Sequence, residues 1–212
     1  GLSSGNYSFS APAGELIHRI ELDVNDPNGV LFFNFNMEND GGLFIPVDQV
    51  INNSGQYYGT ADEDIFSIVD VSVLLNADMS IHGNGGTDTL KLTGEDQMLD
   101  LTNLQGKLSS IEIIDLTGTG NNTLKLSLGD VLEQGGHDLF VTDGKTQMMI
   151  KGAAGDVVQL SDLLPDGVDV GDWAQQAGTV TVEGTTYNVF FHSGMNAELL
   201  VQQGVTTNLE NH

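Results

Sequence analysis

The chain has 212 residues, of which 39% are hydrophobic, 27 are glycine and only 4 are proline, a composition that excludes a disordered tail and suits short strands joined by tight turns. Acidic residues outnumber basic residues by 30 to 6, and the resulting net charge of −24 leaves too few cations for binding nucleic acid or anionic lipid. The chain has no cysteine, which excludes a disulfide-stapled scaffold, and no apolar run of about 18 residues, so we expect no membrane insertion.

The residue pattern in the first quarter of the chain predicts β-structure. Alternating apolar residues predict strands over 7–11, 16–24 and 30–37, with turns at 23–29 and 39–42. The turn at 23–29 faintly resembles the calcium linker of cadherins, but Pro27 interrupts the match and a plain turn is the preferred interpretation. We place a boundary near residue 55, which gives a repeat-like β segment over 1–55 and a second β domain over 56–212.

A loose repeat follows, in which a Gly-rich turn precedes an Asp or Asn and a short apolar alternation. Its four copies place Asp64, Asp88, Asn122 and Asp156 in the same position, at spacings of 24, 34 and 34 residues. Such spacing predicts stacked or serial β units, each unable to bury its apolar face alone.

Strands are also expected between the turns and at the C-terminal end. The C-terminal strands fall at 178–182, 185–190 and 197–201, with a hairpin turn at Glu183 and Gly184, while short helices are possible at 127–134 and 160–164. The expected fold class is therefore all-β. It would be a short-stranded β-sandwich or a set of β-roll or solenoid-like units joined by Gly/Asp turns, with at most one or two short helices.

Three stretches resemble segments of known protein families. Gly83, Gly86, Asp88 and Leu90 match the glycine-rich nonapeptide of RTX proteins, with Asn84 in place of its second glycine. The stretch 111–128 and the stretch from Trp173 to Tyr187 are similar to the end of large type I secreted, Bap-like adhesins of Gram-negative bacteria. The resemblance covers residues 56–212 and implies a secreted or cell-surface protein that supports adhesion and biofilm formation.

The resemblance also implies partners. An uncleaved C-terminal signal in this family is read by an ABC transporter working with an adaptor and an outer-membrane channel. Residues 152–212 contain no Lys or Arg, which fits such an export tail and also fits an ordinary acidic β domain.

Calcium is the cofactor that we expect, because Ca²⁺ prefers carboxylate and backbone oxygens on flexible loops. The candidate ligands lie in the Gly/Asp turns: Asp62, Asp64, Gly83, Asn84, Gly86, Asp88 and Asn122. Asn122 is neutral and would bind more weakly. A β-roll shares each ion between consecutive repeats, so each isolated turn here supplies half a site unless the fold brings two together.

The sequence carries no recognisable catalytic constellation. The five histidines show no metal-ligand spacing, and no Gly-x-Ser-x-Gly motif is present. We therefore expect no enzyme, with a carbohydrate-active enzyme as the weakest alternative. The stronger alternative is a module that binds a glycan or another surface at the adhesin tip, and the aromatic residues Tyr57, Tyr58 and Trp173 could stack on sugars. Core packing is the preferred interpretation of Trp173.

Overall fold

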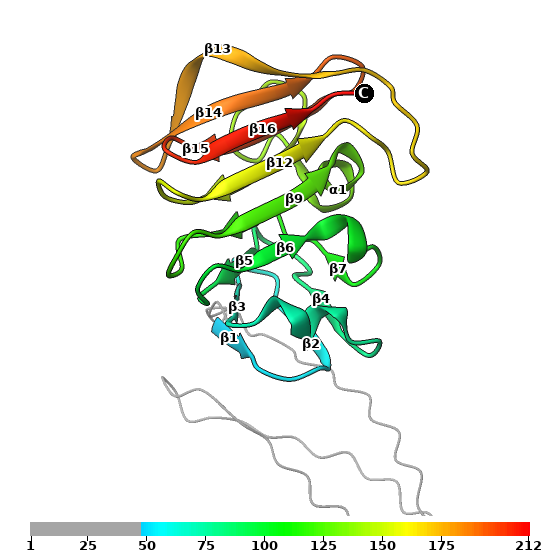
Figure 1. Ribbon diagram of the computed structural model, residues 1–212, viewed down its shortest axis with the longest axis vertical. Helices are drawn as coiled ribbons and strands as arrows, with labels where there is room; N and C mark the ends of the chain where they lie inside the picture. The colour runs from blue at the N-terminus through cyan, green and yellow to red at the C-terminus, as the bar shows by residue number, and fades with distance from the viewer. Residues whose placement is uncertain (1–47) are drawn as a thin grey trace, which may run out of the picture. The chain divides into compact units, whose positions relative to one another are not determined.

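The computed structural model describes residues 48–212. The described chain is built mostly of strands and winds into a solenoid whose successive coils stack on one another (Figure 1). The all-β prediction is confirmed, and the architecture is the solenoid-like one. The strands and turns predicted before residue 43 lie outside the described residues.

The longest sheet runs the length of the stack. Its parallel strands are, in spatial order, β1 (Asp48–Ile51), β3 (Ile65–Ile68), β5 (Thr89–Leu92), β8 (Ile113–Asp115), β11 (Thr146–Lys151) and β15 (Ala197–Gln202). Two antiparallel strands, β14 (Thr185–His192) and β13 (Trp173–Val182), follow β15, and β10 (Gly136–His137) pairs with β11 off this path. Each coil therefore adds one parallel strand, and the hairpin ends the sheet.

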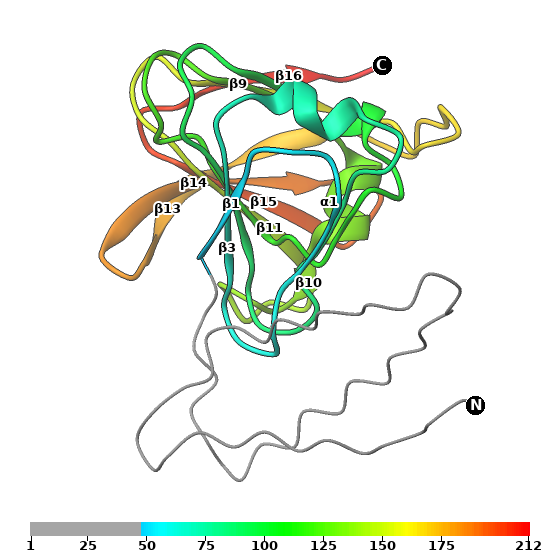
Figure 2. The same ribbon diagram turned by 90° about the horizontal axis from the view of Figure 1, so that it is seen from below.

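Two shorter parallel sheets form the other walls of the solenoid, which Figure 2 shows along the stack. The four-stranded sheet contains β6 (Met98–Asp100), β9 (Thr123–Ser127), β12 (Val157–Ser161) and β16 (Thr206–Glu210). The three-stranded sheet contains β2 (Gln56–Tyr58), β4 (Ser80–His82) and β7 (Leu108–Ser109).

Apolar residues at alternate strand positions point inward and stack in register from coil to coil. The longest such column, all fully buried, consists of Phe66, Leu90, Ile114, Ile150 and Val201. A similar column, Leu99, Leu124 and Val158, lines the four-stranded sheet. One coil alone would leave these side chains in water, so stacking supplies the core.

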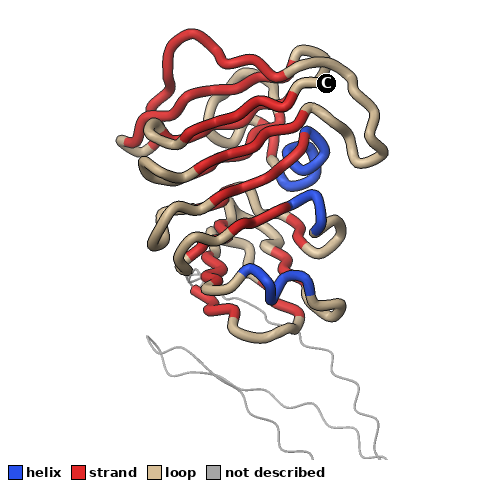
Figure 3. The backbone as a smooth tube through the Cα atoms, viewed as in Figure 1, coloured by secondary structure: helices blue, strands red, loops and turns tan. Residues whose placement is uncertain are grey.

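Helical segments lie on one side of the stack (Figure 3). They are η1 (Val71–Leu75), η2 (Leu101–Asn103) and α1 (Leu128–Gln134). A capping box formed by Ser127 and Asp130 starts α1, which confirms the helix expected at 127–134. The helix expected at 160–164 is wrong, because Leu160 belongs to β12, where it pairs with Leu126 and fills the core.

The C-terminal hairpin extends the long sheet beyond β15. Its turn at Glu183 and Gly184 is the predicted one, since β13 ends at Val182 and β14 starts at Thr185. Outward-facing side chains of four strands form a second, smaller core: Ile113, Met149, Tyr187, Val189 and Leu200. Phe140 and Val141 pack against this core. The predicted strand at 197–201 is confirmed as β15.

The boundary predicted near residue 55 falls between β1 and β2. Both strands pair with the next coil, because β1 joins β3 and β2 joins β4. The first described coil is therefore continuous with the rest of the solenoid.

Candidate cation site at a corner of the solenoid

The two turns most similar to the RTX nonapeptide stack directly on each other. Residues 59–64 connect β2 to β3, and residues 83–88 connect β4 to β5 one coil later. The backbone N–H of Gly85 donates to Thr60 O at 3.2 Å, and the Asn84 side-chain amide donates to Gly59 O at 2.8 Å. The fold thus joins two turns that appear in the sequence as isolated half-sites.

A column of buried acidic residues runs through this corner. The backbone N–H of Asp64 donates to Asp88 Oδ1, and the backbone N–H of Asp88 donates to Glu112 Oε2, both at 2.8 Å. The three residues follow one another at 24-residue intervals and are 0%, 0% and 7% exposed. The carboxylates of Asp88 and Glu112 therefore each satisfy a buried N–H of the preceding coil.

Gly59 and Gly83 make room for this column. A Cβ on Gly59 would lie 2.6 Å from Asp64 Oδ2 and 2.4 Å from Gly83 O. A Cβ on Gly83 would lie 2.3 Å from Asp88 Oδ2 and 1.9 Å from Ser110 O. In both coils a carboxylate oxygen and a backbone carbonyl oxygen therefore lie against the glycine, where a side chain would otherwise stand.

The two coils differ in the hydrogen-bond donors that reach Oδ2 of the aspartate. In the first, the backbone N–H and the hydroxyl of Thr60 both donate to Asp64 Oδ2. In the second, the residue equivalent to Thr60 is Asn84, whose φ is 73° and whose side chain bonds to Gly59 instead. Asp88 Oδ2 is buried and receives no hydrogen bond.

This arrangement makes Asp88 electrostatically unusual. Burial raises the pKa of the Asp88 carboxyl to about 7, and the nearby charges of Glu112, Asp64 and Glu63 also raise it. Burial raises the pKa of Glu112 as well. Near neutral pH, the buried Oδ2 of Asp88, which lacks a donor, therefore favours a proton on the carboxyl or a cation beside it.

Asn122 lies in a different column. Its Oδ1 accepts from Gln97 N at 2.8 Å, its Nδ2 donates to Leu116 O at 3.0 Å, and its backbone N–H donates to Asp156 Oδ1 at 2.8 Å. These residues form the corner that leads into the four-stranded sheet. The four equivalent positions of the sequence repeat are thus divided between two corners, and Asn122 is separated from the other six candidate ligands.

The candidate ligands fit a calcium site only in part. Asp62, Asp64, Gly83, Asn84, Gly86 and Asp88 belong to the stacked turns, and a Cβ on Gly86 would lie 2.4 Å from Asp62 O. Within residues 48–212, no three acidic or histidine side chains converge as a metal-binding group. A cation here would depend on backbone carbonyl oxygens beside Asp88, which is ligand chemistry that Ca²⁺ accepts.

Two residues of this corner were not predicted. Glu112 receives the Asp88 N–H, and Ser110 supplies the carbonyl beside Asp88 Oδ2. Continuing the 24-residue interval beyond Asp88 would have reached Glu112. No sequence signal identifies Ser110, because its role depends on the backbone of the next coil.

The aromatic candidates lie in different environments. Trp173 is 1% exposed and its indole N–H donates to Ser161 O at 3.0 Å, which confirms the core interpretation. Tyr57 packs against the core and its hydroxyl donates to Asn53 O at 2.9 Å. Tyr58 is 53% exposed and its ring stacks on His82.

The predicted export tail, residues 152–212, forms part of the folded solenoid. It contains β12, β13, β14, β15 and β16. The Asn211 side chain exchanges two 3.1 Å hydrogen bonds with the backbone of Trp173, and His212 bonds to the buried carboxylate of Asp162 at 2.7 and 2.8 Å. The export role of this segment stays a prediction.

Comparison with models of known families, with curated proteins and with solved structures finds no match to this chain. Within residues 48–212, no helix has the length and apolar character needed to cross a membrane.

Proposed function

We propose that this chain is the C-terminal region of a large bacterial surface adhesin, exported by a type I machine and folded outside the cell with the help of calcium. Its role there would be non-catalytic, in adhesion and biofilm formation. The observation that carries the proposal is the buried Oδ2 of Asp88, which receives no hydrogen bond from the protein and lies, with Ser110 O, beside Gly83. An acidic, oxygen-only corner built from Gly-rich turns offers the ligands that Ca²⁺ prefers.

The residues that would hold the ion belong to the stacked turns. Asp88 and the Ser110 carbonyl would bind it directly, and Asp64 and the Gly83 carbonyl form the equivalent pair one coil earlier. Bound calcium would supply the positive charge that this corner lacks. The ion would thereby hold together the coils that contribute β3, β5 and β8, whose strands are joined at their N-terminal ends by the acidic column.

Export through a type I machine would explain why folding depends on calcium. Calcium is scarce in the cytosol and abundant outside the cell, so a chain with a charge of −24 would repel itself before export and collapse after it. The antiparallel hairpin that ends the parallel sheet supports a position at the end of a repeat array, because terminal repeats need a distinct cap.

Thermal unfolding of the full chain at pH 8, with chelator and then with millimolar calcium, tests the cation site. One ion at about 100 times its dissociation constant stabilises the fold by roughly 2.7 kcal/mol, so the melting temperature should rise by several degrees. Asp88→Asn should lose this response, and Asp169→Asn, in the exposed loop after β12, should keep it. A melting temperature that calcium does not change would contradict the site.

A further inference from the structure

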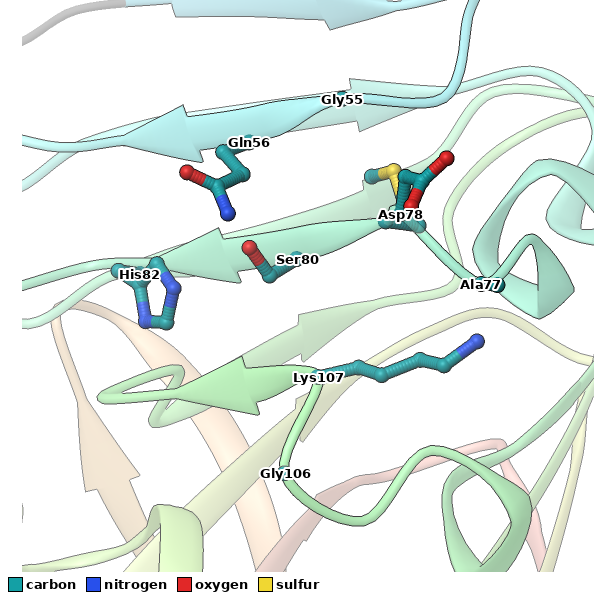
Figure 4. Close-up of a pocket in the computed structure, with 9 residues that line it drawn as sticks. Gly55, Gln56, Ala77, Asp78, Ser80, His82, Gly106 and Lys107 are labelled. Atoms are coloured by element: carbon teal, nitrogen blue, oxygen red, sulfur yellow. The ribbon is translucent and has the colours of Figure 1, made fainter.

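The four histidines within residues 48–212 differ in the groups that their rings contact. His82 lines a shallow groove beside the three-stranded sheet (Figure 4), and its Nδ1 lies 2.8 Å from the Ser109 hydroxyl. His137 and His212 each lie beside a carboxylate, at 3.1 and 2.7 Å. A hydroxyl oxygen and a carboxylate both accept hydrogen bonds, so these three rings can gain a proton and keep their partners.

His192, at the end of β14, is bonded differently. Its Nδ1 accepts hydrogen bonds from the backbone N–H groups of Gly194 and Met195, at 3.2 and 3.1 Å. Because Nδ1 is the acceptor, Nε2 carries the ring proton and donates to Gly171 O at 2.9 Å. The residue is only 5% exposed. The site therefore holds a neutral ring, since a proton on Nδ1 would face two backbone N–H groups.

These bonds belong to a joint between residues 170–172 and residues 192–195. The Ser193 N–H donates to Asp172 O, and the Asp172 N–H donates to Ser193 Oγ, both at 2.9 Å. The two backbones touch, because a Cβ on Gly194 would lie 1.8 Å from a carbonyl oxygen of the opposite segment. Loss of the turn that follows β14 therefore separates the two segments.

The joint holds down the loop that precedes β13. Trp173 forms one fixed end of this loop, since it is 1% exposed and its indole N–H donates to Ser161 O at 3.0 Å. The other end is fixed at Pro165, whose Cδ would lie 2.6 Å from a Cβ on Gly129 of α1. Residues 166–172 lie between these ends and are mostly exposed. This segment can therefore move outward without unfolding a sheet once the joint breaks.

The loop carries two carboxylates close to the joint. Asp169 accepts a hydrogen bond from the Gly171 N–H at 2.9 Å, and the side chain of Asp172 is exposed. Within residues 48–212, the hydrogen bonds of the His192 ring are made with backbone atoms only. A protonated ring would therefore have no acceptor for its Nδ1 proton in the closed joint.

The charged groups on the neighbouring elements are already paired. Glu198 of β15 pairs with Lys145. The His212 ring bonds to the Asp162 carboxylate at 2.7 Å, and this hydrogen bond raises the pKa of His212. A raised histidine pKa means that the pair is strongest when the ring is charged, so it stays closed as the pH falls.

We propose that His192 makes this joint open in acid: a proton on Nδ1 breaks the turn at 193–196 and frees residues 166–172, while the sheets stay folded. The hairpin that ends the long sheet would thereby change its surface with pH. The joint shares no hydrogen bond with the acidic column, so its opening does not depend on calcium at Asp88.

Hydrogen–deuterium exchange of the full chain between pH 8 and pH 5, corrected for the intrinsic exchange rate, tests the proposal. Amides of residues 166–172 and 193–196 should lose protection at least about tenfold between pH 7 and pH 5, where histidines gain their proton. Amides of β5 and β8 should keep theirs. Fluorescence of Trp173, the sole tryptophan, gives a second readout, because its ring centroid lies 5.1 Å from that of His192 and a charged imidazole quenches indole emission.

The variants identify the group that responds. In His192→Asn, the side-chain oxygen can accept from the same two N–H groups and takes up no proton in this range, so the loss of protection should disappear. His192→Gln serves the same purpose if the asparagine variant does not fold. His82→Gln is the control and should open like the wild type. Asp88→Asn, which removes the titrating acid of the column, should also open normally.

Three results would overturn the proposal. The first is unchanged protection of residues 166–172 in the wild type at pH 5. The second is an equal loss of protection in β5 and β8, which would mean global unfolding. The third is a loss of protection that persists when His192 is replaced.

Discussion

The backbone N–H of Asp64 donates a 2.8 Å hydrogen bond to the side chain of Asp88, which lies one coil further along the solenoid. The bond joins two turns that are 24 residues apart in sequence. It also brings a carboxylate into the protein interior, where its second oxygen has no donor. The behaviour of this corner should therefore depend on pH and on cations.

Without calcium, we expect Asp88 to make the solenoid less stable as the pH rises. Its pKa is about 7 in the folded protein against 3.8 ordinarily, so the folded state binds this proton more tightly than the unfolded state. The stabilisation is fully present below pH 3.8 and is lost as the pH rises through 7. Urea unfolding in chelator between pH 5 and 8 should show the wild type losing about 2–4 kcal/mol relative to Asp88→Asn.

At pH 8 in chelator, Asp88→Asn should be more stable than the wild type. The asparagine amide can donate to Ser110 O, as the protonated acid would, and it carries no charge. Melting curves at pH 8 check this directly. A variant that is less stable than the wild type under these conditions would show that Asp88 is already satisfied there.

Gly83→Ala should destabilise the solenoid by about 2–4 kcal/mol, because its Cβ would lie 1.9 Å from Ser110 O and 2.3 Å from Asp88 Oδ2. Gly85→Ala is the matched control, since its Cβ would come no closer than 3.5 Å to any atom and its φ is not positive. Chemical unfolding of both variants gives the comparison. Equal stabilities would mean that the corner can relax around a methyl group.

Lys145→Gln should cost about 3 kcal/mol, because Lys145 pairs with Glu198, whose side chain is 2% exposed. The substitution leaves a buried carboxylate with only the 3.2 Å hydrogen bond from Gln147. Lys91→Gln removes an ion pair with Asp115 in which the lysine side chain is 37% exposed, and it should change stability by less than about 1 kcal/mol. Urea midpoints measured side by side would reveal whether burial of the partner decides the difference.

Export should require the C-terminal segment. Deleting residues 152–212 should abolish secretion by a type I machine, and the remaining chain should stay inside the cell. Deleting residues 1–47 leaves every described strand in place and should leave export intact. Immunoblots of medium and cells measure both outcomes, and normal secretion of the C-terminal deletion would place the signal elsewhere.

The solenoid could be predicted from the sequence because its coils repeat. The interval between Asp64 and Asp88 is one coil, as the pairing of Ile65 with Thr89 shows. The 34-residue interval between Asp88 and Asn122 is not one coil, because it leads from one corner to another. Later coils are longer, since Ile113 pairs with Met149 and Met149 pairs with Leu200. Helix α1 and the C-terminal hairpin account for much of the added length, and no period in the sequence reveals which coil will contain them.

The residue types of the candidate cation site could be predicted from the sequence, but their arrangement in space could not. Gly and Asp at fixed offsets mark the turns that contain Asp64 and Asp88. The difference between these residues arises because Thr60 donates to Asp64, whereas the equivalent Asn84 donates to Gly59 O and leaves Asp88 Oδ2 without a donor. The difference in burial between Tyr57 and Tyr58 likewise follows from the alternation of side chains along β2, which places one ring inside and the other outside.

The antiparallel hairpin closes one end of the long sheet to further coils. Another parallel coil could follow β15 only if β14 were displaced. The outermost strand, β13, is interrupted by an irregularity between Gln175 and Thr179, and most of its residues are exposed. A broken, polar edge is a poor template for a strand of a second molecule. The hairpin should thus keep neighbouring molecules from joining end to end into fibres when many copies are crowded at one surface.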